Sequence, residues 1–521
     1  MKRKTWGLKS TAALLAAGLF LSYGNGLPSA ENAASAAESG DFVTFNIDKS
    51  INGGIAVKGV DISSVIACEQ SGVVYKDENG QPQDIFKTLA ENDVNYIRVR
   101  VWNHPYDTEG NSYGGGNCNT YNAGLIGKRA KEYGMKLLVD LQYSDFWADP
   151  DKQTEPKDWT GYSFEWKRDA VYNYTVSALT EIRDAGADIG MVQIGNETNC
   201  FFCGTKDMDE IAELFKCGIA GAHDVDRNIL TAVHFANPSL TSYYEWYAQK
   251  LSEHSVDYDI FATSYYSYWH GDTNNLTSIL KSISDKYNKY VMVAETAYPY
   301  TSEDGDSFGN AVSSASDSNI MRYDISPEGQ EKAVLDAFKA VAAVGPKGIG
   351  VFYWEPAWIG VSGNSYYENY ELWQKYGSGW ATETAAEYEA DVTQAGGSSY
   401  DNQALFDFDG KPLPSLSVFK KVLPESNNYI PHDEPEEQYI PGDFNNDKKV
   451  NCFDLIILRQ MLTDGQLGSD KRKHADFNSS GEIDAFDLEM HNSFILGDVS
   501  DLSGKQRVYN HPDNMNDQKE R

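Results

Sequence analysis

The sequence is poor in positive charge relative to negative charge. It holds 44 Lys and Arg against 77 Asp and Glu among 521 residues, which gives a net charge of −33. Nucleic-acid binding depends on clustered Lys and Arg that neutralise phosphates, so this composition argues against a nucleic-acid partner. It favours instead a soluble protein that acts on a neutral substrate, with some of its carboxylates available to bind cations.

Long apolar runs are also scarce. The run 12–21 is too short to span a bilayer and no later segment is long enough, so no membrane-spanning part is expected. This run lies between Lys2-Arg3-Lys4 and the small residues 34–36, an order typical of an export signal with its cleavage site. We therefore expect residues 1–36 to be a signal peptide and the mature protein to be secreted. A retained lipid or helical anchor is the alternative.

Cysteine and histidine are few, with six and nine residues respectively. Cys200, Cys203, Cys217 and His223 lie close together in the sequence, but their spacing fits no zinc pattern well. Export permits disulfides. A local disulfide and free thiols both remain open for the 200–203 segment.

Short apolar runs alternate with amphipathic helical stretches after the signal. This alternation predicts an α/β fold, a (β/α)₈ TIM barrel over residues 37–423, and favours it over an open doubly wound sheet. The predicted strands are 58–62, 95–101, 135–141, 189–194, 228–234, 260–265, 290–294 and 348–354. The predicted helices include 83–92, 125–133, 164–185, 208–222 and 329–344.

Two glutamates lie where predicted strands end. Glu197 follows the fourth strand and Glu295 the seventh, and these strands face each other across a barrel mouth. Retaining glycoside hydrolysis needs two carboxyl groups about 5–5.5 Å apart, and a neighbouring amide such as Asn196 can bind the sugar 2-hydroxyl. Each glutamate taken alone could be a surface residue. The pair at matching strand ends predicts a catalytic site for glycoside hydrolysis.

Longer motifs resemble glycoside hydrolase family 53, the arabinogalactan endo-β-1,4-galactanases. These motifs are RVRVW at 98–102, YGGGN at 113–117, YSDFWADPDKQ at 143–153, SYYSYWHG at 264–271, ETAYP at 295–299 and FYWEPAW at 352–358. They occur in the family's order between about residues 59 and 413. The resemblance implies a retaining barrel enzyme that cuts the β-1,4-galactan side chains of pectin, with no cofactor for catalysis.

The resemblance also implies roles for individual residues. Glu197 would be the acid/base, Glu295 the nucleophile and Arg98 the cation that steadies the nucleophile. The remaining residues implied to bind or surround the sugar are Arg100, Trp102, Asn196, His234, Tyr265 and Trp354. Trp354 would be the platform beneath the sugar, whereas Trp102 and His234 would line the mouth. Barrel packing is the alternative for the aromatic residues.

Three segments near the site carry further expectations. Gln142 stands where the family commonly has His, and the segment from Cys200 to Cys203 replaces the usual Ile-Asn-Asn-Gly-like continuation. Its two phenylalanines are candidates to reshape a binding subsite. The 304–310 loop resembles a calcium-binding loop of bacterial members, which implies the ligands Asp304, Asp306 and Asn310; a solvated acidic loop is the alternative.

A second module follows a linker at 424–440, which is rich in Pro, Glu and Asn. Two twelve-residue segments place oxygen ligands at positions 1, 3, 5, 7, 9 and 12, a spacing that suits calcium; position 7 uses its backbone carbonyl. The first set is Asp443, Asn445, Asp447, Lys449, Asn451 and Asp454. The second set is Asp476, Asn478, Ser480, Glu482, Asp484 and Asp487. An Asp/Asn-rich turn is the alternative, which the duplication opposes.

The duplicated pattern resembles a type I dockerin over residues 441–498. The resemblance implies a small all-α domain with two Ca²⁺ sites, a cohesin partner on a scaffold protein and association with a cellulosome. Ser480 replaces an expected Asp and should weaken the second site. Cys452-Phe453 and Ala485-Phe486 replace the familiar Ser-Thr pair, which suggests an unusual cohesin. We expect residues 499–521 to be a disordered tail.

Two other functions remain open. The barrel could belong to another enzyme of the same clan, such as an endo-mannanase or a cellulase, although the specific loop motifs oppose this. It could also be a non-catalytic carbohydrate-binding barrel. The intact set of Glu197, Glu295, Asn196 and Arg98 opposes that second alternative.

Overall fold

The computed structural model describes residues 42–199, 201–313, 321–390, 392 and 394–424, together with the isolated residues 450, 458 and 491. The chain divides into two units, Met1–Tyr429 and Ile430–Arg521. The predicted signal peptide, nearly all of the linker, the tail and the twelve predicted calcium ligands of the second unit lie outside the described residues.

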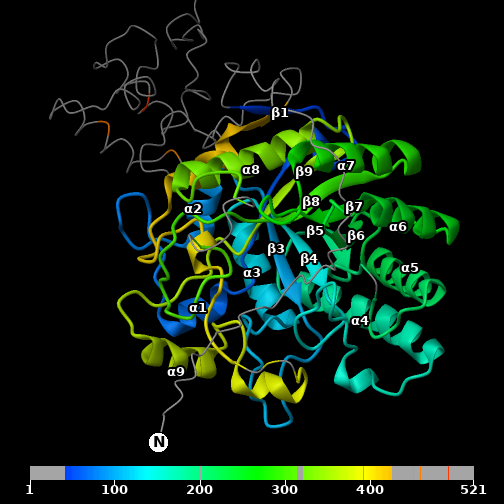
Figure 1. The fold of residues 1–521 in the computed structure, drawn as a ribbon, viewed down its shortest axis with the longest axis horizontal. Coiled ribbons are helices and arrows are strands. Elements are labelled where there is room, and N and C mark those ends of the chain that lie inside the picture. Colours follow the sequence, from blue (N-terminus) through cyan, green and yellow to red (C-terminus); the bar gives the residue numbers. More distant parts are fainter. Residues whose placement is uncertain are drawn as a thin grey trace, which may run out of the picture. The chain divides into compact units, whose positions relative to one another are not determined.

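Eight parallel strands close into a barrel in the first unit, and Figure 1 shows them at its centre. In order they are β2 (Val57–Asp61), β3 (Tyr96–Val101), β4 (Lys136–Leu141), β5 (Ile189–Ile194), β6 (Leu230–Ala236), β7 (Ile260–Ser264), β8 (Tyr290–Thr296) and β9 (Gly348–Trp354). Parallel pairing of β9 with β2 completes the closure. The predicted TIM barrel is confirmed, and every predicted strand end lies within two residues of the observed one.

Burial on both faces explains why these strands read as nearly continuous apolar runs. Every residue of β3 is buried. Because side chains alternate across a strand, Arg98 and Arg100 share one face while Ile97 and Val99 share the other. The charged face contacts other barrel strands, since Arg98 bonds to Asp61 of β2 and Asp140 of β4. The barrel interior therefore holds buried charges.

Helices surround the barrel, as Figure 1 shows for α3 to α8. The helices are α1 (Val65–Ser71), α2 (Ile85–Glu91), α3 (Thr120–Glu132), α4 (Phe164–Asp184), α5 (Met208–Val225), α6 (Thr241–Glu253), α7 (Thr273–Tyr287), α8 (Pro327–Ala342) and α9 (Tyr366–Tyr376). Side chains of Asp207, Asp272 and Ser326 accept hydrogen bonds from the first turns of α5, α7 and α8. The five helical stretches predicted from the sequence correspond to α2, α3, α4, α5 and α8.

A second, two-stranded sheet joins the two ends of this unit. β1 (Val43–Phe45) pairs in parallel with β10 (Val422–Pro424). Short 3-10 turns complete the described elements: η1 (Asn52–Gly54), η2 (Lys157–Trp159), η3 (Glu383–Glu387), η4 (Asp401–Gln403) and η5 (Pro414–Lys421). Among the described residues, none of the helices combines the length and apolarity needed to cross a membrane.

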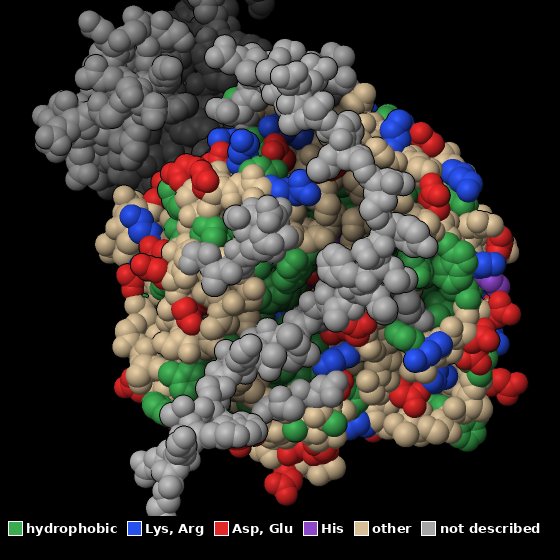
Figure 2. All heavy atoms as spheres, viewed as in Figure 1, with side chains coloured by type: hydrophobic (Ala, Val, Ile, Leu, Met, Phe, Trp, Pro, Cys, Tyr) green, Lys and Arg blue, Asp and Glu red, His purple; other side chains and the backbone are tan. Residues whose placement is uncertain are grey.

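The carboxyl ends of the barrel strands carry long connections and strained backbone. Two such connections, 142–163 and 297–326, follow β4 and β8. Tyr143, Glu197 and Glu355 each lie just after a barrel strand with φ of 51°, 46° and 49°. Left-handed backbone at non-glycine residues gathers at functional sites, and barrel enzymes place their chemistry at this face. Figure 2 shows acidic and basic side chains interspersed over the visible described surface, without a large basic patch.

Candidate active site

Glu197 lies three residues after β5 and is partly exposed, so a substrate can reach its carboxyl group. Its left-handed backbone lets the chain turn sharply out of the strand, and Asn199 then bonds to both the amide and the carbonyl of Ala236 at the end of β6. Desolvation of its carboxyl group and the nearby charge of Glu295 raise the pKa of Glu197 well above its ordinary value. A carboxyl group in this state is suited to donate a proton.

Glu295 lies within β8 and is only 6% exposed. Its Oε1 lies 2.9 Å from a guanidinium nitrogen of Arg98, and its Oε2 accepts a 3.1 Å hydrogen bond from the Tyr266 hydroxyl. Burial raises the pKa of Glu295, whereas Arg98 and Tyr266 act in the opposite direction. Both contacts favour the carboxylate form, which is the form a nucleophile needs.

Arg98 is the centre of this site. Besides Glu295, its guanidinium contacts Asp61 at 2.8 Å, Asp140 at 3.0 Å and the side-chain oxygen of Asn196 at 2.9 Å. All of these side chains are at least nine-tenths buried. A guanidinium presents several N–H donors in one rigid plane, so it fixes several acceptors at once. The structure thus brings together the predicted residues Arg98, Asn196 and Glu295.

His234 lies behind Glu197 rather than at the mouth, because its ring is fully buried. Its Nδ1 lies 3.4 Å from the amide nitrogen of Glu197, 3.0 Å from Nε2 of Gln193 and 3.0 Å from Oδ1 of Asn196. Its Nε2 lies 3.0 Å from the Ser264 hydroxyl, and Ser264 in turn bonds to Glu197. Burial lowers the pKa of His234 well below its ordinary value, which keeps the ring neutral. The prediction that His234 lines the mouth was wrong.

Trp102 is also fully buried, and its predicted place at the mouth was wrong. Its ring packs against Phe146 and Trp147, and its indole N–H donates to Gln142 at 2.7 Å. Gln142 also donates to Asp140 at 3.0 Å. This glutamine therefore links the aromatic packing around Trp102 to the carboxylates around Arg98.

The tyrosine that bonds to Glu295 is Tyr266, which was not predicted, whereas Tyr265 was implied to bind the sugar. The Tyr265 hydroxyl donates to the backbone carbonyl of Gly271, whereas the Tyr266 hydroxyl donates to Glu295. Successive side chains point in opposite directions in extended chain, so the two neighbouring tyrosines bond to different partners. Tyr266 also packs edge-on against His270, which holds its ring in place.

Trp354 is the last residue of β9 and is 9% exposed. Its ring lies among Trp147, Trp358 and Tyr400, at centroid distances of 6.4, 6.0 and 4.8 Å. The Arg100 guanidinium lies 4.4 Å from the centre of the Trp147 ring and 5.7 Å from that of Trp354. The indole rings of Trp147, Trp354 and Trp358 thus form an aromatic wall. The Arg100 guanidinium lies against two of them, Trp147 and Trp354.

The segment after Glu197 contributes to the core as well as to the surface. Phe202 is fully buried and stacks on Phe215 at 4.9 Å, so it does not reshape a subsite as predicted. Phe201 is partly exposed, with the Lys206 ammonium 4.2 Å from its ring centre. Cys203 is a buried free thiol, which excludes the local disulfide in this structure, and Cys200 lies outside the described residues.

An acidic cluster occupies the 304–310 loop. Carboxylate oxygens of Asp304, Asp306 and Asp401 lie within 4.8 Å of one another. Burial raises the pKa of Asp306 to about 7, and burial with the charge of Asp306 raises that of Asp401. Buried oxygens of Asp401 and Asn310 have no hydrogen-bond partner. This set fits a hard cation such as Ca²⁺, and Asp401 is a candidate ligand that the sequence motif did not identify.

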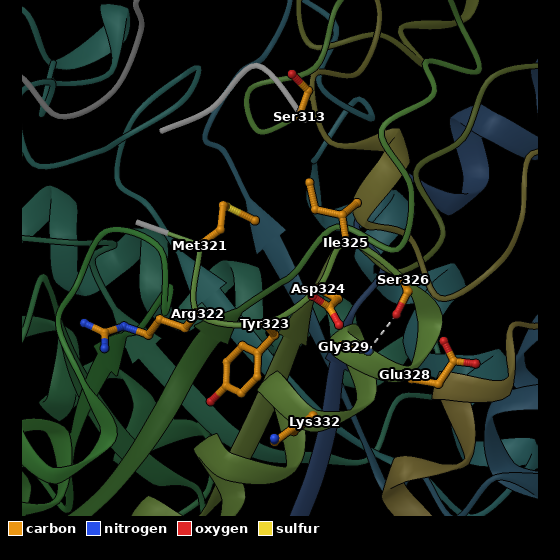
Figure 3. A pocket seen from close by; sticks show the side chains of 10 residues that line it. All are labelled: Ser313, Met321, Arg322, Tyr323, Asp324, Ile325, Ser326, Glu328, Gly329 and Lys332. Atoms are coloured by element: carbon orange, nitrogen blue, oxygen red, sulfur yellow. Dashed lines mark hydrogen bonds between the residues drawn. The ribbon is translucent and has the colours of Figure 1, made fainter. Parts of the chain in front are cut away.

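A separate cavity of about 570 Å³ lies beside the first turn of α8. Figure 3 shows Arg322, Tyr323, Ser326 and Lys332 among the side chains around it. Neither Glu197 nor Glu295 lines this cavity. It is therefore distinct from the site around Arg98.

The site also includes residues that were not predicted, among them Asp61, Asp140, Tyr266 and Glu355. The three carboxylates carry the same signal that identified Glu197 and Glu295, because each is an acidic residue in or directly after an apolar strand run. All three are fully buried or nearly so, and each pairs with Arg98 or Arg100. The sequence therefore shows acidic residues at these strand ends. Their pairing with arginine could not be predicted, because it depends on which strands the closed barrel brings together.

Comparison with known proteins agrees with this geometry. Residues 57–419 match the model of glycosyl hydrolase family 53, and residues 441–496 match that of the dockerin type I domain. The chain is 52% identical over 367 residues to the endo-beta-1,4-galactanase of Bacillus subtilis (strain 168), which covers 70% of this chain and 85% of that protein. It is 30% identical over 383 residues to the arabinogalactan endo-beta-1,4-galactanase of Thermothelomyces thermophilus, covering 71% and 100%.

A solved structure agrees as well. The GH53 catalytic domain of Ignisphaera aggregans superposes with a TM-score of 0.64 at 35% identity, covering 73% of this chain and 99% of that chain. The family match spans more than half of the chain and includes the barrel and both glutamates. The protein thus belongs to glycosyl hydrolase family 53, a family of glycoside hydrolases, and carries a C-terminal type I dockerin domain.

Proposed function

We propose that this protein is a secreted, retaining endo-β-1,4-galactanase that cuts the β-1,4-galactan side chains of pectin. The single observation that carries the proposal is the Arg98–Glu295 ion pair, with Glu197 nearby just after β5, in a chain 52% identical to a named endo-beta-1,4-galactanase. The export-type sequence at residues 1–36 supports secretion.

In this proposal the two carboxyl groups have different tasks. Glu197 protonates the leaving sugar oxygen, while Glu295 attacks the anomeric carbon and forms a glycosyl–enzyme bond. Glu197, now a carboxylate, then takes a proton from the water that breaks this bond. Arg98 and Tyr266 stabilise the charge of Glu295 before attack and after release, and Trp354 supports the sugar ring.

Galactan hydrolysis tests the proposal directly. The wild type should release oligosaccharides from galactan but not from mannan or carboxymethylcellulose. Glu295→Ala should lower kcat by at least about a thousandfold, because it removes the nucleophile. The exposed Glu132→Ala, at the far end of α3, should leave the rate unchanged. Cleavage of mannan or cellulose in preference to galactan would reject the proposed substrate.

Tyr266 gives a prediction about pH. Its hydroxyl donates to the Glu295 carboxylate and lowers the pKa of that group, so Tyr266→Phe should raise this pKa. Since Glu295 must be ionised to attack, the acidic limb of kcat/KM should move to higher pH, by about one unit. Tyr265→Phe, whose hydroxyl bonds to Gly271, should leave the limb in place. An unmoved limb in Tyr266→Phe would contradict the assigned contact.

The carboxylates of Asp304, Asp306 and Asp401 suit a structural Ca²⁺ in the catalytic unit, with Asn310 as a further oxygen donor. All eleven tryptophans precede residue 381, so tryptophan fluorescence reports unfolding of this unit rather than of the dockerin.

Chelation should therefore lower the unfolding temperature followed by tryptophan fluorescence. Calcium at about a hundred times its Kd contributes about 2.7 kcal/mol to a folded state that binds it. Asp401→Asn should unfold at the same temperature with and without calcium. A wild type that is equally insensitive to calcium would exclude the site.

The dockerin module supports attachment to a scaffold through a cohesin domain. Its two predicted calcium loops, with first ligands Asp443 and Asp476, would be ordered by Ca²⁺ because the hard oxygen ligands converge only around the ion. This attachment would place the enzyme in a cellulosome outside the cell.

Binding to a panel of immobilised cohesins tests this attachment. The full chain should bind at least one cohesin in calcium and lose binding in chelator, and Asp443→Ala should bind more weakly than the wild type. Galactan hydrolysis by Asp443→Ala should be unchanged, which separates the two modules. Cohesin binding of equal strength in chelator would contradict a calcium-ordered dockerin.

A further inference from the structure

Glu355 is the first residue after β9 and directly follows Trp354. It is 1% exposed and adopts a left-handed backbone with φ of 49°. One carboxylate oxygen, Oε2, is buried without a hydrogen-bond partner. A buried charge, a strained backbone and an unpaired oxygen are each unfavourable, so their retention at one position beside the site calls for an explanation.

The other oxygen of Glu355 holds Arg100. Oε1 lies 2.6 Å from a guanidinium nitrogen of Arg100 and accepts a 2.8 Å hydrogen bond from the Ser64 hydroxyl. Arg100 also lies 3.5 Å from Asp61, which contacts Arg98 at 2.8 Å. Negative and positive side chains therefore alternate in a row that runs from Glu355 through Arg100, Asp61 and Arg98 to the nucleophile Glu295.

The Arg100 guanidinium lies against the aromatic wall. It lies 4.4 Å from the centre of the Trp147 ring, and the Trp147 indole N–H donates to the carbonyl of Trp380 at 2.9 Å. Trp147 is partly exposed, whereas Arg100 and Glu355 are buried behind it. A cation held over an indole face restrains the tilt of that ring.

We infer that Glu355 is a positioning residue for sugar binding: it fixes the Arg100 guanidinium, which in turn fixes Trp147 and Trp354. This inference rests on the proposed function, because it concerns the affinity of the same cleft for its polysaccharide. Glu355 makes no contact with the nucleophile among its described bonds, so it acts on the wall more than on the chemical step. A purely stabilising role is the weaker explanation, because buried ion pairs often add little stability.

The test compares Glu355→Gln with the wild type on galactan. The amide keeps the shape of the side chain but removes the charge that holds Arg100. KM should rise about tenfold while kcat changes by less than about threefold, because binding is lost and both catalytic carboxyl groups remain. Arg100→Lys should act in the same way, and the double variant should be no worse than the more affected single variant, since both act through one contact.

A second Glu–Arg–aromatic arrangement gives a matched control. Glu69 pairs with Arg129 at 2.7 Å between α1 and α3, and Arg129 lies 4.5 Å from the centre of the Phe86 ring. Glu69→Gln should leave KM unchanged. Direct titration of a galactan oligosaccharide into Glu197→Gln, with and without Glu355→Gln, should show the same tenfold loss in affinity.

The outcomes separate this inference from the proposed function. An unchanged KM and an unchanged oligosaccharide affinity in Glu355→Gln would overturn the positioning role alone. If kcat of Glu355→Gln falls only in proportion to the fraction of unfolded protein and KM stays normal, the role of Glu355 is structural. That result would also overturn the positioning role. Failure of the wild type to cleave galactan would overturn the proposed function and this inference with it.

Discussion

The buried charge of Arg98 is the constraint on which the site depends. A guanidinium inside a barrel is tolerated only when acceptors surround it, and Arg98 contacts Asp61, Asp140, Asn196 and Glu295. Each acceptor comes from a different strand or strand end. The charge of Arg98 is therefore compensated only when the barrel is closed, and the closed barrel tolerates this charge only with all of these acceptors in place. The same charge opposes the rise in pKa that burial gives Glu295, whereas Glu197, which lacks such a direct ion pair among the described contacts, has its pKa raised well above its ordinary value. One cation thereby acts unequally on the two glutamates and favours the carboxylate form of Glu295.

Polar side chains behind the charged residues extend the hydrogen-bond network around Arg98. Gln142, Gln193 and His234 connect the charged residues to aromatic packing on one side and to Glu197 on the other. Left-handed backbone at Tyr143, Glu197 and Glu355 lets the chain leave its strand sharply at three points of the mouth. Such positions persist only where surrounding contacts hold them. Glu355 is held by Arg100, whereas Tyr143 is held by Thr175 and by packing against Phe202.

Most of the fold could be predicted from the sequence because buried parallel strands and amphipathic helices have distinct periods. Glu197, Glu295 and Asn196 were identifiable because polar residues at the ends of apolar runs are conspicuous, whereas Arg98, which lies within β3, was identified through the family resemblance. The errors at Trp102 and His234 have a different origin. Whether a strand-end side chain faces the cleft or the layer behind it depends on one residue of register and on packing from other strands, which local sequence does not encode. Asp401 was missed for the same reason, since it lies about a hundred residues from the loop it joins.

The central claim, that Arg98 holds Glu295 as the ionised nucleophile, is tested most directly by trapping the covalent intermediate. A 2-deoxy-2-fluoro β-galactobioside with a good leaving group forms the glycosyl–enzyme bond but releases it slowly. Peptide mapping should locate the sugar on Glu295 in the wild type, and Arg98→Ala should be labelled much more slowly. Labelling of Glu197, or equally fast labelling without Arg98, would contradict the account.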